Sequence, residues 1–136
     1  MTSFPLKIVT PDGLVFDGQA EMVVVRTTEG DMAVMARHIN CVVPLGMGTA
    51  TITANGERKL AACIGGMLSV NNGECTLVPT TFEWAEDIDV SRAVRAQEKA
   101  QAILDAKNED QVAQKLAEAK LHRALIRQNV AAQFRG

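Results

Sequence analysis

Basic side chains gather in the last part of this sequence, at spacings that suit the binding of an anion. Residues 111–136 hold five lysines or arginines and a single acid, Glu118, so their local charge is 5 − 1 = +4. Lys120, Arg123 and Arg127 are three and four residues apart, which places them on one face of a helix. No acid stands three or four residues from any of them, so we expect their partners to lie outside this helix.

A mixed acidic and basic stretch, EDIDVSRAVRAQEK at residues 86–99, is the second candidate region. If the chain turns back near residue 108, positions whose numbers sum to about 216 lie level, which predicts Asp89 beside Arg127 and Arg92 close to Arg123. The three arginines could bind a polyanion such as a nucleoside triphosphate. The basic face could instead dock on an acidic protein, or be solvated with one Asp89–Arg127 pair worth about 0–1 kcal/mol. Charge and spacing alone favour the solvated face.

Metal-binding and nucleophilic chemistry find little support in the sequence. Cys41, Cys63 and Cys75 are odd in number, far apart and without a Cys-x-x-Cys pair, which indicates reduced core residues rather than disulfides or a zinc site. His38 and His122 are the two imidazoles, and they are widely separated. We therefore expect no catalytic residues and no metal ligands.

Composition excludes further classes of protein. The net charge is −2, with 14 basic and 16 acidic residues, whereas a nucleic-acid-binding protein or a polybasic membrane anchor needs a basic excess. No run approaches about 18 apolar residues, and the N-terminal residues resemble neither a signal nor a transit peptide. These features predict one soluble, intracellular domain, with at most an appendage.

Residues 1–84 are predicted to form an antiparallel β-sandwich or flattened barrel. Turn signals are Pro-Asp-Gly at 11–13 and Asn-Gly at 55–56 and 72–73, the last two typical of hairpins. Apolar and threonine residues alternate over 49–54, which predicts a strand with one buried face.

Two other stretches of this region carry specific expectations. The apolar run EMVVVRTT at residues 21–28 predicts a strand covered on both faces, by a second sheet or by a partner protein. Gly65 and Gly66 fall between two strand-like runs, where glycine permits a bulge or lets another backbone come close.

Residues 85–136 are predicted to form an antiparallel hairpin of two helices. Asp87 or Asp89 can cap the first helix, and the break at 106–110 offers Asn108 and Asp110 as turn and cap residues. Alanines dominate the apolar faces and bury little area each, so we expect a weakly anchored hairpin that can detach or open.

Taken together, these features resemble, from end to end, the epsilon subunit of bacterial F-type ATP synthases, which is called delta in mitochondria. The matching residues are IVTPDG at 8–13, EMVVV at 21–25, the turn from Glu29 to Asp31, His38, the Gly65-Gly66 pair and, above all, AEDIDVSRA at 85–93. The absence of a transit peptide favours the bacterial subunit.

The resemblance implies a non-catalytic subunit of the central stalk, at the cytoplasmic face of the bacterial membrane and bound there only through its complex. A β-sandwich would contact the gamma subunit and the c-subunit ring. The subunit would couple rotation of the c-subunit ring to the catalytic head. Its helical hairpin would restrain ATP hydrolysis when it extends toward the beta and alpha subunits. The implied partner contacts are Glu29, Asp31, His38, Lys120, Arg123 and Arg127.

The resemblance also implies that ATP is a regulatory ligand, with no cofactor required. In several members an Ile-Asp-x-x-Arg-Ala motif binds ATP and stabilises the folded hairpin, and the implied nucleotide-binding residues here are Glu83, Ile88, Asp89, Arg92, Ala93, Arg123 and Arg127. Lys99 stands where some of these members have arginine. Two alternatives stay open: a free-standing ATP sensor, and a passive stalk scaffold that binds no nucleotide.

Overall fold

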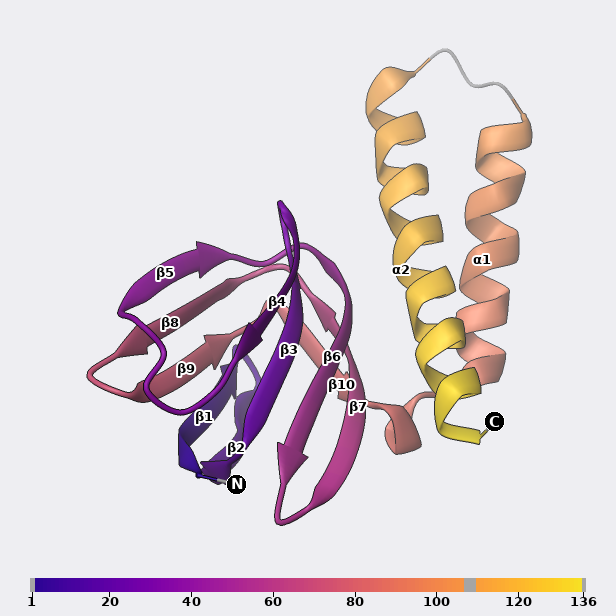
Figure 1. Ribbon diagram of the computed structural model, residues 1–136. Coiled ribbons are helices and arrows are strands. Elements are labelled where there is room, and N and C mark those ends of the chain that lie inside the picture. The colour runs from indigo at the N-terminus through magenta and orange to yellow at the C-terminus, as the bar shows by residue number, and fades with distance from the viewer. Residues whose placement is uncertain (1, 107–109, 136) are drawn as a thin grey trace. The chain divides into compact units, whose positions relative to one another are not determined.

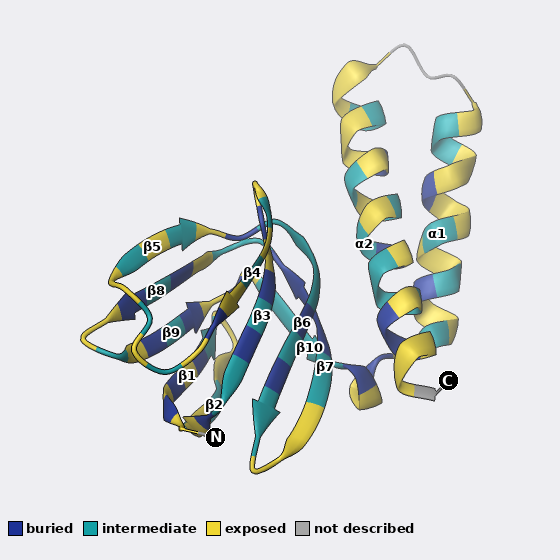
Figure 2. Ribbon diagram, viewed as in Figure 1, coloured by how far each residue is buried: buried dark blue, intermediate teal, exposed yellow. Residues whose placement is uncertain are grey.

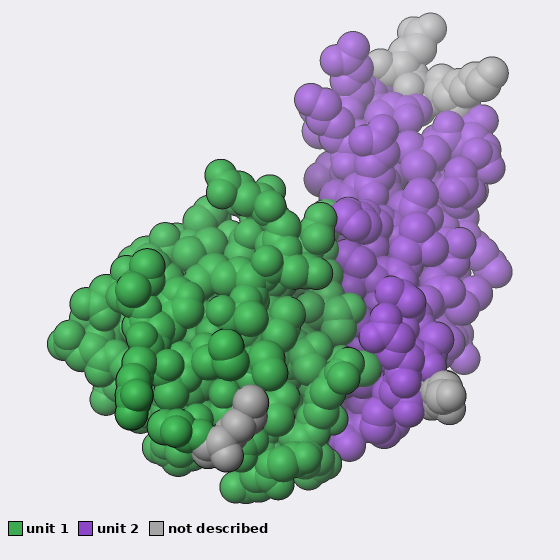
Figure 3. Space-filling model, in the orientation of Figure 1, with its two compact units in different colours: residues 1–84 green, residues 85–136 purple. Residues whose placement is uncertain are grey.

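The computed structural model describes residues 2–106 and 110–135 of the chain, which divides into two compact units. The first unit spans Met1–Trp84 and the second Ala85–Gly136 (Figures 1 and 3). The first unit is built of strands and the second of helices, so the predicted fold class, a β-sandwich followed by two helices, is confirmed.

Ten strands form two five-stranded sheets in the first unit. The sheet orders are β2-β1-β9-β8-β5, here called sheet A, and β10-β7-β6-β3-β4, called sheet B. Neighbouring strands pair antiparallel, as predicted, with one exception. Strands β1 and β9 pair in parallel, which the sequence did not predict. The strands are β1 (Phe4–Thr10), β2 (Gly13–Ala20), β3 (Met22–Thr27), β4 (Gly30–Val34), β5 (Cys41–Pro44), β6 (Met47–Ala54), β7 (Glu57–Ile64), β8 (Met67–Asn71), β9 (Glu74–Val78) and β10 (Thr81–Trp84).

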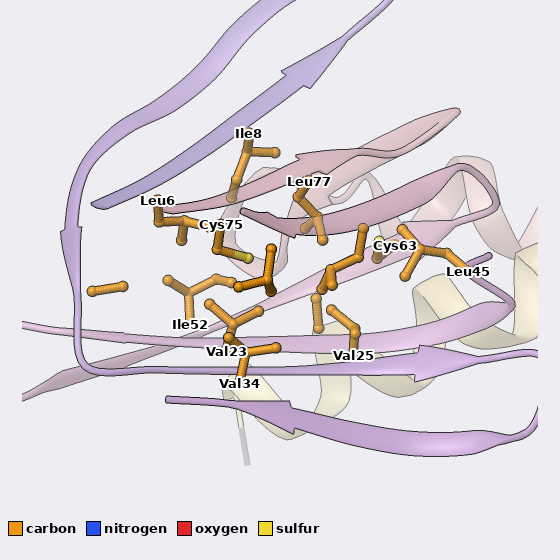
Figure 4. Packing of buried hydrophobic residues seen from close by; sticks show 14 of the residues in the cluster. Leu6, Ile8, Val23, Val25, Val34, Leu45, Ile52, Cys63, Cys75 and Leu77 are labelled. Atoms are coloured by element: carbon orange, nitrogen blue, oxygen red, sulfur yellow. The ribbon is translucent and has the colours of Figure 1, made fainter. Parts of the chain in front are cut away.

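The hydrophobic core lies between the two sheets. Leu6 and Leu77 from sheet A face Val23, Val25 and Ile52 from sheet B, and each of the five is at most 2% exposed (Figure 4). Burying a side chain of this size contributes about 1.5–3 kcal/mol, so this cluster is the main source of stability of the first unit.

Strand β3 buries one of its two faces within this chain. Val23 and Val25 are buried, whereas Met22 and Val24 are half-buried and Arg26 is exposed. Figure 2 shows this alternation of buried and less buried residues along the strands. One face of β3 therefore packs in the core, and the second sheet covers that face. Cover of the other face by a partner protein, the second predicted alternative, stays a prediction.

The predicted turns are present, and each is made by local chemistry. Asn55-Gly56 joins β6 to β7 and Asn72-Gly73 joins β8 to β9, with positive φ at all four residues, as a two-residue hairpin turn requires. At Gly66, with φ of +97°, a Cβ atom would lie 2.1 Å from the carbonyl oxygen of Val78. Glycine there permits a close backbone approach, as predicted.

The three cysteines are free thiols in the first unit. Cys63 and Cys75 are buried and Cys41 is half-buried. Burial raises the pKa of the Cys63 thiol to about 12. Burial, followed by the charge of Cys41, raises the pKa of Cys75 to about 11. The prediction of reduced core residues is confirmed for Cys63 and Cys75.

The second unit contains a short 3-10 helix, η1 (Ala85–Asp87), and two long helices, α1 (Val90–Asp105) and α2 (Gln111–Arg135). Asp89 is the N-cap of α1. Asp110 caps α2, because its carboxylate accepts hydrogen bonds from the N–H groups of Val112 and Ala113 at 3.0 and 3.3 Å. Asn108, the predicted turn residue, lies outside the described residues. Within the described ranges, neither helix is long and apolar enough to cross a membrane.

One side-chain hydrogen bond joins the two long helices. The amide of Gln128 donates it to Gln97 Oε1 at 2.7 Å, and the numbers of this pair sum to 97 + 128 = 225. Each glutamine leans toward the N-terminus of its own helix, so in an antiparallel hairpin the two side chains reach toward each other along the axis, and their Cα atoms lie several residues out of level. The prediction that positions summing to about 216 lie level stays a prediction.

Candidate functional site

The Ile-Asp-x-x-Arg-Ala stretch begins helix α1 and is arranged by the cap of that helix. Ile88 and Ala93 are 3% and 4% exposed, so they anchor the stretch. The Asp89 carboxylate accepts a hydrogen bond from the N–H of Arg92 at 3.1 Å, which fixes the first turn. The Arg92 side chain is exposed. The start of α1 thus carries a carboxylate that caps the helix and, in its first turn, an exposed arginine side chain.

The basic residues of α2 lie on the other helix of the hairpin. Arg123 and Arg127 are half-buried and one helical turn apart, whereas Lys120 is exposed. Arg127 is adjacent to Gln128, which bonds Gln97 of α1, so this part of α2 packs against α1. Half-buried guanidinium groups hold their positions better than fully exposed ones, which suits them to bind an oxyanion.

Glu83, the remaining nucleotide-binding candidate, belongs to the first unit. It lies on β10, where it pairs with Ala62 of β7 and is half-buried. Its neighbours Phe82 and Trp84 pack against the core and meet edge to face, with ring centroids 4.9 Å apart. Lys59 Nζ lies 4.7 Å from the centroid of Trp84. Glu83 is therefore held on a well-packed edge strand.

Of the predicted partner contacts in the first unit, Glu29 and Asp31 flank the turn between β3 and β4. Both are exposed. Asp31 Oδ1 lies 3.4 Å from Arg26 Nη1, and the turn is held by Thr27, whose hydroxyl accepts from the Glu29 N–H at 3.1 Å. An exposed ion pair of this kind contributes little to stability, which leaves both acids available to a partner.

His38 lies in the loop between β4 and β5. Its ring Nδ1 is 2.9 Å from the carbonyl oxygen of Ile39 and 3.9 Å from Cys41 Sγ. Ile39 is 77% exposed. A cavity of about 280 Å³ lies beside the start of this loop, lined by Thr2, Glu21, Met35, Ala36 and Arg37. Among the described residues, no three His, Cys, Asp or Glu side chains are grouped so that they could hold a metal ion.

An exposed apolar row crosses the outer face of sheet A, and the sequence interpretation missed it. Pro44, Met67 and Val78 are direct cross-strand neighbours on β5, β8 and β9, and all three are exposed. Val42, two residues before Pro44 and 69% exposed, extends the same face. We call these four residues the apolar row. A contiguous exposed apolar surface of this kind is typical of a protein interface.

The comparisons with known proteins cover almost the whole chain. The family model of the ATP synthase delta/epsilon chain beta-sandwich domain matches residues 3–85, and that of the delta/epsilon chain long alpha-helix domain matches residues 86–132. The chain belongs to the ATP synthase delta/epsilon chain family.

Individual delta/epsilon relatives agree with these models. The ATP synthase epsilon chain of Shouchella clausii is 37% identical over 131 residues, 96% of each chain. The epsilon chain of Bacillus velezensis is 38% identical over 131 residues, 96% of this chain and 98% of that one. A chain of the Euglena gracilis mitochondrial ATP synthase has a TM-score of 0.81 at 23% identity, over 98% of this chain and 82% of that chain, which shows a shared fold.

Family membership confirms the resemblance inferred from the sequence. The relatives are named as a chain of ATP synthase, which agrees with the prediction of a non-catalytic subunit of that complex. The apolar row could not be predicted from local patterns, because it needs the register between strands far apart in sequence, such as β5 with β8.

Proposed function

We propose that this chain is the epsilon subunit of the central stalk in a proton-translocating F-type ATP synthase, at the cytoplasmic face of the membrane. The first unit would bind the gamma subunit and the c-subunit ring. The helical hairpin would restrain ATP hydrolysis when it extends toward the beta and alpha subunits. The chain would be attached to the membrane only through the complex.

The apolar row is the observation that best supports a permanent partner of the first unit. Pro44, Met67 and Val78 lie next to each other on three strands, and the row ends at the edge strand β5. Such a surface is costly to leave in water, so its presence is best explained by a subunit that covers it.

Binding to purified gamma subunit tests this part of the proposal. Met67→Lys places a charge in the middle of the row and should weaken gamma binding at least tenfold, because the ammonium group would be desolvated without a partner. Asn71→Lys is the matched control, because it adds the same charge to the same face at the other end of β8. Equal affinities of both variants and the wild type would exclude the row as the contact.

The packing of the hairpin supports a regulatory role. Small side chains are buried between its helices, while several large apolar side chains stay exposed. Ala100, Ala117 and Ala124 are 2% exposed or less, whereas Leu116 and Phe134 on α2 are 56% and 53% exposed. Each buried alanine contributes little hydrophobic energy, so the helices can separate at moderate cost. The exposed apolar residues are then available to another subunit.

Deletion of residues 87–136 tests the inhibitory role. The truncated chain should still assemble, and the complex should hydrolyse ATP faster than the wild-type complex. The two rates are compared at equal amounts of assembled enzyme. An unchanged rate would favour the passive scaffold.

We further propose that ATP binds the folded hairpin through Asp89, Arg92, Arg123 and Arg127, with Ile88 and Ala93 as packing residues and Glu83 as a further contact. The proposal is supported by the carboxylate and guanidinium at the start of α1 and by two half-buried arginines one turn apart on α2. Calorimetric titration of the whole chain with magnesium ATP should give binding that Arg92→Ala and Arg127→Ala each weaken. Lys120→Ala, an exposed cation of the same helix, is the control.

The titration and co-purification with the gamma subunit together separate the alternatives. A passive scaffold binds no ATP. A free-standing ATP sensor binds ATP but does not co-purify with gamma.

A further inference from the structure

Both Asn-Gly hairpin turns carry the groups of a spontaneous chemical reaction. In an Asn-Gly pair the backbone nitrogen of glycine can attack the side-chain amide carbon of asparagine, because glycine has no Cβ atom to shield its nitrogen. A five-membered cyclic imide forms and ammonia leaves. Water then opens the imide at either carbonyl carbon, which gives aspartate or isoaspartate. Asn55-Gly56 and Asn72-Gly73 are the two such pairs of the sequence, and both asparagines are exposed to water.

The folded turns hold the reacting groups apart. The φ angles of the two central residues are +54° and +74° in the turn after β6, and +51° and +82° in the turn after β8, as in a type I′ turn. The first central residue of such a turn has a ψ of about +30°, which places the following nitrogen on the side of the Cα–C bond opposite to the asparagine side chain. The attack therefore requires that the tip of the hairpin opens first.

Each tip is also tied to a side chain far away in the sequence. Glu21 precedes β3, and its Oε2 accepts a hydrogen bond from the Gly56 N–H at 3.3 Å. Asn40 precedes β5, and its Oδ1 accepts a hydrogen bond from the Asn72 N–H at 2.9 Å. The two bonds span 35 and 32 residues of sequence. In both turns the donor is a central residue, whose N–H group is not part of the ladder between the strands.

These two hydrogen bonds favour the closed turns, because opening breaks them. The population of the open tip sets the rate of a slow reaction that occurs only there, when opening and closing are fast. One net hydrogen bond at an exposed position changes such a population by about two- to fivefold. Glu21 and Asn40 should therefore slow the reaction without taking part in it.

We propose that Asn55 and Asn72 are sites of spontaneous deamidation and that Glu21 and Asn40 restrain it, each at its own turn. The reaction converts one amide and one water molecule into a carboxylic acid and ammonia, so it requires neither an oxidant nor an enzyme. Isoaspartate also adds a methylene group to the main chain, which a two-residue turn of fixed register does not accommodate. The proposal goes beyond the proposed function, because it holds whichever partners the chain binds.

Peptide mapping by mass spectrometry tests the proposal on the whole chain. The chain is incubated at mildly alkaline pH, and the conversion of each asparagine is followed by its gain in mass. An isoaspartate-specific methyltransferase reports the second product. Both sites should react more slowly in the folded chain than in urea, where the turns are open. Asn71 is an internal control that should react far more slowly in urea, because the residue after it is Asn72 rather than glycine.

Removal of each restraining side chain should act at one turn only. Glu21→Ala should raise the rate at Asn55 by about two- to fivefold and leave Asn72 unchanged. Asn40→Ala should raise the rate at Asn72 by a similar factor and leave Asn55 unchanged, so each variant is the matched control for the other. Glu21→Gln and Asn40→Asp keep an oxygen acceptor and should react at close to the wild-type rate. In urea all variants should match the wild type.

Several results would overturn the proposal. Equal rates in the folded chain and in urea would show that the turns do not restrain the reaction. Unchanged rates in both alanine variants would show that the hydrogen bonds do not. A rise at both turns in a single variant would trace the effect to the stability of the whole unit. A lower rate at Asn55 in Glu21→Ala would mean that the carboxylate assists the attack instead of opposing it.

Discussion

Replacement of Gly66 by alanine tests how the β-sandwich is closed between β7 and β8. The new Cβ would lie 2.1 Å from Val78 O and 2.6 Å from Pro79 Cα, both backbone atoms that no rotamer change can move. The φ of +97° adds about 1–2 kcal/mol for any residue with a Cβ atom. Relief of the overlap would also strain the 2.8 Å hydrogen bond from Leu45 N–H to Gly66 O, worth about 1 kcal/mol. We expect a loss of at least about 3 kcal/mol.

Denaturation followed by fluorescence measures this loss. Trp84 is the single tryptophan of the chain and packs against the core of the first unit, so its emission reports the unfolding of that unit. A loss of about 3 kcal/mol should lower the melting temperature by more than about 10 °C in a unit of this size.

Gly56→Ala is the matched control for this prediction. Gly56 also has a positive φ, +74°, but a Cβ there meets nothing within 4 Å. Gly56→Ala should therefore lower the free energy of unfolding only by the cost of placing alanine at a positive φ, about 1 kcal/mol. If the two variants prove equally stable, the close approach at Gly66 contributes nothing, and the reasoning from the backbone contact is refuted.

Further perturbations follow from single groups. In the folded chain the pKa values of Cys63 and Cys75 are raised to about 12 and 11, so as pH rises these thiols ionise in the unfolded chain before they ionise in the folded one. The free energy of unfolding should therefore fall above about pH 9, by about 1.4 kcal/mol per pH unit for each thiol. Urea titrations across that range should show the fall, and Cys63→Ala with Cys75→Ala should reduce it. Asp89→Ala should cost the hairpin about 1 kcal/mol by loss of the N-cap, whereas Asp89→Asn should keep the cap and, if ATP binds as proposed, lose affinity in calorimetry. Thr27→Val should cost about 1–3 kcal/mol because it removes the 2.6 Å bond to Gly30 O, while Thr27→Ser should be nearly neutral in the same fluorescence assay.

Features that depend on neighbouring residues could be predicted from the sequence. The turns at Asn55 and Asn72 follow from the tolerance of asparagine and glycine for positive φ. Asp89 and Asp110 cap their helices because a carboxylate two or three residues before free N–H groups satisfies them. The same local rules located the start of α1, where the candidate carboxylate and arginine stand.

Features that depend on distant residues could not be predicted in this way. The parallel pairing of β1 with β9 joins strands about seventy residues apart, and no periodicity encodes it. The apolar row also depends on the pairing of distant strands. Pro44 and Val78 lie on different strands and become neighbours of Met67 only through the register of β5 with β8 and of β8 with β9.

The register of the hairpin also bears on the proposed ATP site, whose residues are divided between the two helices. Asp89 and Arg92 belong to α1, while Arg123 and Arg127 belong to α2. If one helix were shifted along the other by seven residues, Arg123 and Arg127 would move by about 10 Å relative to Asp89 and Arg92. That distance is more than the length of an arginine side chain can compensate. An anion that bridges the helices would therefore bind one register and stabilise it by mass action, by about 2.7 kcal/mol at a hundredfold excess over its Kd. The Gln97–Gln128 hydrogen bond also joins the two helices before any ligand binds, so part of the cost of ordering the site would fall on the fold rather than on the ligand.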